Sequence, residues 1–82
     1  MGRPSKKAPA SLARNARTLG GNVRRLRQLA ELSQEELAKA ADLRQALISE
    51  IERGEANPRL DSLTKIADAL KARLIDLFHH DR

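Results

Sequence analysis

Several residue types are missing or scarce in this 82-residue sequence, which has no cysteine, tryptophan or tyrosine and a single phenylalanine. Without cysteine there can be neither a disulfide nor a thiolate zinc site, and a reducing cytoplasm is the simplest compartment. With one aromatic side chain, the core must be aliphatic, and the length allows one small domain. No apolar run approaches the roughly 18 residues of a membrane span, so we expect a soluble cytoplasmic protein without a membrane partner.

Acidic residues are absent from the sequence before Glu31, although eight lysines and arginines stand there. From Glu31 onward eight basic residues face eleven acidic ones, so the net charge of +5 combines a +8 leading part with a −3 remainder. A basic segment beside a mildly acidic body favours a polyanionic partner such as nucleic acid. The alternative is a solvated tail that only keeps the protein soluble.

Patterns for catalysis or metal binding are also absent. The sequence has no glycine-rich phosphate loop and no HExxH motif. His79 and His80 are neighbours, whose side chains point apart on a helix, and no cysteine or third histidine completes a metal site. We therefore expect no enzyme activity, no metal and no cofactor, and we interpret both histidines as tail residues.

The segment 33–54, SQEELAKAADLRQALISEIERG, is the most informative part of the chain. Ser33 and Glu36 have the spacing of a capping box, in which each side chain accepts a hydrogen bond from the other residue's backbone N–H. The pair predicts a helix that begins at Gln34. Apolar and small residues recur on one face of this helix as far as Ala41.

A second helix is predicted over residues 45–53. Ile48 and Ile51 resume the apolar face at helical spacing, and Gly54 supplies the positive φ that commonly ends a helix. Since only a few residues separate the two helices, the segment predicts a helix-turn-helix.

The remaining apolar periodicity completes a prediction of an all-α, five-helix domain over residues 19–82, preceded by a basic, flexible arm over residues 1–18. Its other helices are expected at residues 19–30 or 22–30, at residues 61–70, and in a short terminal helix that holds Leu74, Leu77 and Phe78. The first helix could begin earlier, because SLARNARTL is compatible with a helix and only Gly20-Gly21 interrupts it.

Four segments in order resemble the phage-repressor-like helix-turn-helix regulators, the Cro/repressor-type family also named after the xenobiotic response element. They are LGGNVRRLRQLAELSQEELAKAADL, ISEIERGEANP, SLTKIADAL and LIDLF, which together lie within residues 19–78. The sequence departs from the family at Glu31, where glycine or asparagine is usual, and at Asp42 and Lys71, where glycine is usual. It also has Arg44 where the family has serine or threonine. Arginine is a poor N-cap, so we expect a looser start of the second helix, or one fixed by a DNA phosphate.

The resemblance implies that the exposed N-terminal part of the second helix reads base edges. The matching residues are Gln45, Ala46 and Glu50, with Ser49 nearby. Glutamine can pair with adenine, alanine can meet a thymine methyl, and glutamate can accept from cytosine. The alternatives are that Gln45 is a solvated amide and that Glu50 only orients a neighbouring arginine.

The resemblance also implies contacts to DNA phosphates around this helix. The candidates are Gln34, Arg44, Arg53, Asn57 and Arg59. Gln34 stands at a helix start, where free N–H groups and the helix dipole favour an anion. Each of the five could instead be an idle surface residue. A further implication is a partly buried, structural ion pair between Arg27 and Glu52.

Two other segments are candidates for contacts outside the major groove. Gly2-Arg3-Pro4 resembles the core of minor-groove hooks, and the alternative is a disordered arm that gathers phosphate charge. Leu74, Leu77 and Phe78 have the i, i+3 and i+4 spacing of an apolar helix face and are our candidates for a dimer contact. The alternative is that Phe78 plugs the core.

Together these observations predict a sequence-specific transcriptional regulator that binds an inverted repeat of double-stranded DNA as a homodimer. The length fits a compact, stand-alone regulator of the restriction-modification controller kind, and a phage-type repressor fits nearly as well. An antitoxin that binds a toxin protein and its own promoter is the main alternative. A third is a protein-binding adaptor with the same fold.

Overall fold

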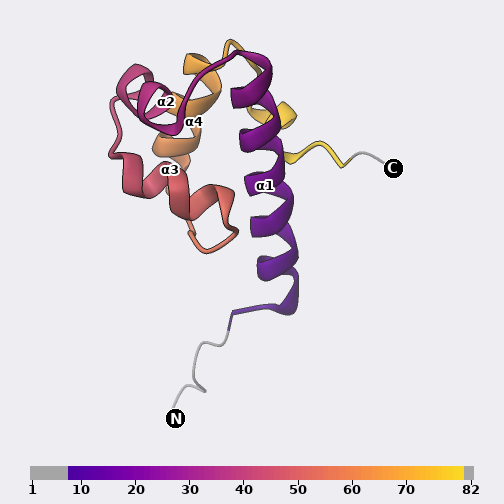
Figure 1. The fold of residues 1–82 in the computed structure, drawn as a ribbon. Helices are drawn as coiled ribbons and strands as arrows, with labels where there is room; N and C mark the ends of the chain where they lie inside the picture. The colour runs from indigo at the N-terminus through magenta and orange to yellow at the C-terminus, as the bar shows by residue number, and fades with distance from the viewer. Residues whose placement is uncertain (1–7, 81–82) are drawn as a thin grey trace.

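The computed structural model describes residues 8–80, which fold into four α-helices and one short 3₁₀ helix. They are α1 (Ala10–Leu29), α2 (Gln34–Ala41), α3 (Gln45–Glu52), α4 (Leu60–Ala69) and η1 (Leu74–Phe78), as Figure 1 shows. The all-α prediction is confirmed. The predicted fifth helix is wrong in type, because the Asp76 N–H bonds to the Arg73 carbonyl at 2.9 Å, three residues back, and this tightens the turn.

Helix α1 begins at Ala10, so residues 10–18 of the predicted arm are helical and the predicted start at residue 19 or 22 is too late. Nor does the Gly20-Gly21 pair interrupt the helix. Gly20 lies where α1 meets α3, and a Cβ atom there would stand 2.2 Å from the Ile51 carbonyl oxygen. Gly20 is therefore a point of close helix approach. The Gly2-Arg3-Pro4 segment lies outside the described residues.

Helices α2 and α3 form the predicted helix-turn-helix. The Ser33 hydroxyl accepts from the Glu36 N–H at 3.0 Å, and the Glu36 carboxylate accepts from the Ser33 N–H at 2.8 Å, which completes the capping box. By contrast, Arg44 at the start of α3 makes no capping hydrogen bond through its side chain. The start of α2 is therefore fixed by side-chain hydrogen bonds, whereas the start of α3 is not.

All four α-helices end in the same way, with a residue of positive φ followed by a residue whose N–H reaches back to the last helical turn. The reaching bonds run from Leu32 to Arg27, from Leu43 to Ala38, from Glu55 to Glu50 and from Ala72 to Ala67. This Schellman motif favours glycine at the left-handed position. Only Gly54 satisfies that preference here, while Glu31, Asp42 and Lys71 take φ values of 57–61°. These three are among the four positions at which the chain departs from the family's usual residue, and Arg44 is the fourth.

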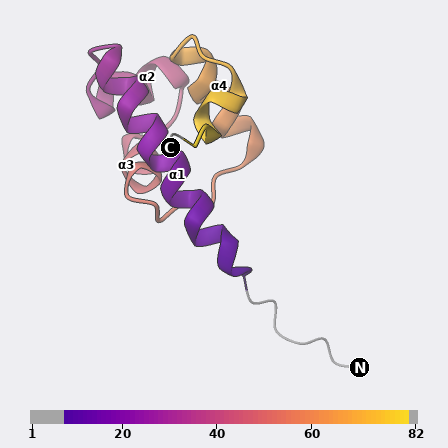
Figure 2. The same ribbon diagram turned by 90° about the vertical axis from the view of Figure 1, so that its right-hand side faces the viewer.

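The core is aliphatic and joins all five elements. Its fully or nearly buried members are Leu19, Val23, Leu37, Ala38, Ala41, Ile48, Ile51, Leu63, Ile66, Ala67 and Leu77. Helix α1 packs against α3 and η1, while α2 packs against α3 and α4. In Figures 1 and 2 the helix-turn-helix and α4 accordingly lie together beside α1. This packing leaves one face of α3 and one face of α1 free of other elements.

Candidate nucleic-acid interface

The outer face of α3 carries the residues expected to read bases. Gln45, Ala46 and Glu50 are exposed and Ser49 is half-buried, whereas Ile48 on the opposite face is buried. Because the helix is anchored from behind, its polar side chains project from a rigid support. This arrangement can enter a major groove, whose width admits one α-helix.

Helix α3 is held in place by an ion pair between Arg27 of α1 and Glu52. Arg27 Nε lies 2.6 Å from Glu52 Oε2 and Nη2 lies 3.1 Å from Oε1, with side-chain exposures of 12% for Arg27 and 2% for Glu52. The hydrogen bond from Arg27 to Glu52 raises the pKa of the arginine, although burial opposes this effect. Arg27 also donates to the Leu32 carbonyl at 2.8 Å. The pair therefore connects α1, the α1–α2 loop and α3.

Gln34, one of the expected phosphate contacts, also joins this cluster. Its amide nitrogen donates to Glu52 Oε1 at 3.0 Å, so the side chain is turned toward α3. A phosphate at this helix start would have to be met by backbone N–H groups of α2. No local sequence signal indicated the Gln34–Glu52 contact, because the two residues belong to different helices.

Two of the expected phosphate-binding arginines are held by acidic neighbours. Arg53 Nε lies 3.0 Å from Glu55 Oε1, and the Arg53 guanidinium also donates to the Ser49 hydroxyl. Arg59 Nε lies 3.5 Å from Asp61 Oδ1. These pairs are exposed, and such pairs contribute little free energy, so a phosphate can replace the carboxylate. Arg44 and Asn57, the other two candidates, are exposed.

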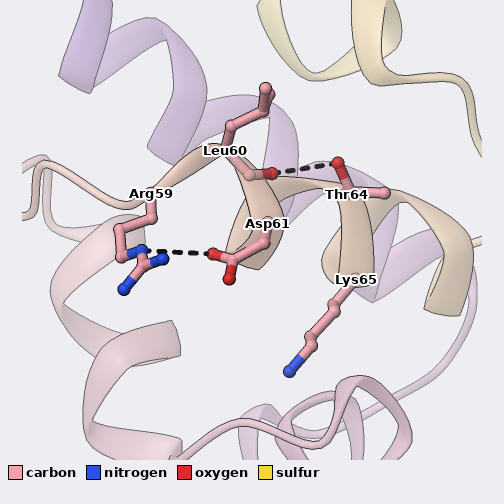
Figure 3. Close-up of a pocket in the computed structure, with 5 residues that line it drawn as sticks. All are labelled: Arg59, Leu60, Asp61, Thr64 and Lys65. Carbon is pink, nitrogen blue, oxygen red and sulfur yellow. Dashed lines mark hydrogen bonds and ion pairs between the residues drawn. The ribbon is translucent and has the colours of Figure 1, made fainter.

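A shallow depression at the start of α4 contains the Arg59–Asp61 pair (Figure 3). Arg59, Leu60, Asp61, Thr64 and Lys65 line it, and the Thr64 hydroxyl donates to the Leu60 carbonyl at 2.9 Å. The depression holds no arrangement of nucleophile and base. Its significance is that Lys65, which was not among the expected phosphate contacts, lines the same depression as Arg59.

The residues expected at a dimer contact separate into two groups. Leu77 is completely buried between α1 and α4, so its expected place at an interface is wrong. Leu74 and Phe78 remain exposed, Phe78 by 41%, and Ile75 is more exposed than either. A 3₁₀ helix has three residues per turn rather than 3.6, so Phe78 does not share the face of Leu74 and Leu77.

Within residues 8–80, no group of acidic and histidine side chains is arranged to hold a metal ion. In the same part of the chain no helix combines the length and the apolar character needed to cross a membrane.

A helix-turn-helix with a polar outer face, flanked by arginines and anchored by a buried ion pair, is the architecture of a DNA-binding domain. The helix-turn-helix family HTH_3 matches residues 23–77, and the chain belongs to this family. It is a DNA-binding, non-enzymatic transcriptional regulator of the Cro/repressor type.

Comparison with individual proteins gives the same class. The chain is 43% identical over 68 residues to the control protein C.BamHI of Bacillus amyloliquefaciens, covering 80% of this chain and 84% of that protein. The restriction-modification controller protein C.AhdI from Aeromonas hydrophila superposes with a TM-score of 0.77 at 34% identity, over 79% of this chain and 98% of that one. Antitoxin HigA1 of Mycobacterium tuberculosis is 39% identical over 71 residues, which cover 87% of this chain and 48% of the antitoxin.

Proposed function

We propose that this chain is a controller-like regulator that binds an inverted-repeat operator as a twofold dimer, with α3 in the major groove. The observation that carries the proposal is the outer face of α3, where Gln45, Ala46 and Glu50 are exposed above a buried apolar face. Similarity to a control protein across most of that protein's length supports the controller assignment.

The proposed roles follow from the surroundings of each residue. Gln45 and Glu50 would read base edges, together with Ala46 and Ser49. The exposed arginines 44, 53 and 59, with Asn57 and the backbone at Gln34, would meet phosphates and set the register of α3. Arg53 and Arg59 would exchange their carboxylate partners for phosphates during binding.

The sharpest test of the α3 register is Gln45→Ala. Removal of a bidentate base contact should cost about 1–3 kcal/mol of binding to the selected operator and relax preference at one or two base pairs. Affinity for random duplex should barely change. The measurement is anisotropy titration with both duplexes, after the operator has been obtained by selection from a random pool. Equal losses of affinity for both duplexes would identify Gln45 as a backbone contact and contradict the register.

Dimerisation is proposed because one short helix reads only a few base pairs, and a second half-site adds affinity and specificity. With Leu77 in the core, the candidate contact consists of Ile75 and Phe78, which lie one 3₁₀ turn apart on the same face of η1, with the exposed Leu74 beside them. The operator half-sites should then lie about one helical turn, ~34–36 Å, apart.

Sedimentation tests the proposed contact. Ile75→Glu places a charge on this surface without entering the core, and it should convert a dimer into a monomer. Leu29→Glu is the matched control, because Leu29 is an exposed leucine at the end of α1. A dimer that survives Ile75→Glu is not built on η1.

The antitoxin function is the second candidate, favoured by the similarity to HigA1. It predicts that a separate toxin protein binds this chain while the helix-turn-helix domain stays folded. Co-expression with proteins encoded beside this gene would identify such a complex. If none forms while operator binding is retained, the controller function stands alone.

A further inference from the structure

A second basic site lies on α1, away from the outer face of α3. Its lining residues are Arg17, Thr18, Gly21, Asn22, Arg25, His79 and His80, which surround a shallow depression between α1 and the C-terminal segment. Among residues 8–80, no acidic residue lines it. In Figure 1 the C-terminal segment leaves the fold on the side of α1 opposite α2 and α3. The depression therefore lies on a different surface from the reading face of α3.

One buried amide organises this depression. Asn22 is only 7% exposed, and its Nδ2 donates to the Leu77 carbonyl at 3.0 Å and to the His79 carbonyl at 2.8 Å. Its Oδ1 accepts from Arg25 Nη2 at 3.1 Å. A single side chain thus attaches the C-terminal segment to α1 and also orients one arginine of the site. Preorganised donors of this kind lose less conformational freedom when they bind an anion.

The floor of the depression is open because residue 21 is glycine. A Cβ atom there would meet nothing within 4 Å, in contrast to the crowded Gly20 next to it. Glycine is unfavourable in the middle of a helix by roughly 1 kcal/mol relative to alanine. Neither helix packing nor a positive φ requires it at this position. Its effect is to keep the space between Arg17 and Arg25 free of a side chain.

The positive charge continues along the helix on both sides of the depression. Arg14, Arg17, Arg24 and Arg25 are all exposed, and at 100° per residue they fall on one face of α1, opposite the buried Leu19. Helix α1 contains no acidic residue, and none of the four arginines forms an ion pair within residues 8–80. At 1.5 Å per residue, the span from Arg14 to Arg25 is about 16 Å. This is a strip of cations, with donor groups at its centre.

We propose that this strip is a second DNA-backbone site, in which the depression around Gly21 holds a phosphate. Arginine, histidine and threonine all offer donors to phosphate oxygens, and arginine can do so through two N–H groups. The depression has no large apolar side chain among its lining residues, whereas a protein partner would require an apolar centre. Protein–DNA interfaces are instead polar and basic. The inference rests on DNA being the ligand, as in the proposed function.

A charge series at position 21 tests the site. The Cβ atom that Gly21→Lys, Gly21→Gln and Gly21→Glu each add meets nothing within 4 Å, and all three residues favour a helix, so each variant should fold, and melting curves verify this. The control series places the same three residues at Ala40, an exposed position on α2. Affinity for a long random duplex should fall roughly tenfold from lysine to glutamate at position 21, and about twofold at position 40. The Arg17→Gln/Arg25→Gln variant should lower the slope of log K against log salt by about 0.9 for each phosphate that these two arginines neutralise.

Duplex length shows which DNA occupies the strip. If the dependence of DNA affinity on the charge at position 21 disappears on a duplex trimmed to the operator, the strip contacts flanking DNA of the same duplex. If it persists and two labelled duplexes are recovered in one complex, the strip binds a second duplex. Both outcomes support a backbone site. The proposal is overturned if the charge series at positions 21 and 40 change DNA affinity equally on every duplex. It is also overturned if the series at position 21 changes only the binding of an acidic protein.

Gln45→Ala in the same titrations separates this inference from the proposed function. If Gln45→Ala lowers the preference for the operator while the substitutions at position 21 leave DNA affinity unchanged, only the second site is rejected. If neither Gln45→Ala nor the substitutions at position 21 change DNA binding, the proposed function fails as well.

Discussion

The two faces of α1 use the same residue types for opposite purposes. On the inner side, Gly20 permits contact with the α3 backbone and Arg27 is bound to Glu52. On the outer side, Gly21 faces open space and Arg24 is exposed without an ion pair within the described chain. Adjacent glycines and neighbouring arginines thus differ in role because of what surrounds them. Residue type alone therefore does not show which glycine or which arginine has the structural role.

The largest difference should be between the two arginines. Arg27→Met leaves Glu52 buried without its partner and should cost about 3–5 kcal/mol of unfolding free energy, whereas Arg24→Met should stay within about 0.5 kcal/mol. Urea unfolding measures both. Adding Glu52→Leu to Arg27→Met should recover much of the loss, because both charges are then removed. A small loss in Arg27→Met alone would mean that Glu52 is satisfied by Gln34 without the arginine.

Next in size is the difference between the glycines. Gly20→Ala forces a Cβ atom against the Ile51 carbonyl and should destabilise the fold by about 1–3 kcal/mol or more. Gly21→Ala meets no atom and should stabilise it by up to about 1 kcal/mol through helix propensity. Thermal unfolding should therefore move in opposite directions for two neighbouring substitutions. Shifts of the same sign would contradict the close approach of α1 and α3 at Gly20.

The smallest effect concerns residue type at the helix ends, where Lys71 and Gly54 occupy the same left-handed position of the same motif. Lys71→Gly removes about 1–2 kcal/mol of backbone strain but adds freedom to the unfolded chain, so a net gain of about 0.5 kcal/mol is expected. Asp42→Gly should gain less, because aspartate tolerates this conformation better. Chemical denaturation at constant m-value can resolve the order. A larger gain at Asp42 would show that its side chain adds no support to the turn.

Several features could be predicted from the sequence, because they depend on residues close together in the chain. The Ser33–Glu36 capping box placed the start of α2, and Gly54 marked the end of α3. Apolar spacing located α3 and α4 to within one residue at each end. The resemblance to a helix-turn-helix family then indicated the class of protein and the order of its elements. The individual base and phosphate contacts stay predictions, since they depend on DNA.

Other features depend on residues far apart in the chain and became visible only once the helices were packed together. Local propensity treats Gly20 as an interruption, but its contact with the Ile51 carbonyl makes it part of a helix crossing. Spacing placed Leu77 on an outer face, yet a 3₁₀ turn against α1 and α4 buries it. Asn22 offered no local signal, because its partners lie at Leu77 and His79. Sequence determines where helices form through short-range hydrogen bonds, while the role of each side chain depends on which distant backbone packs against it.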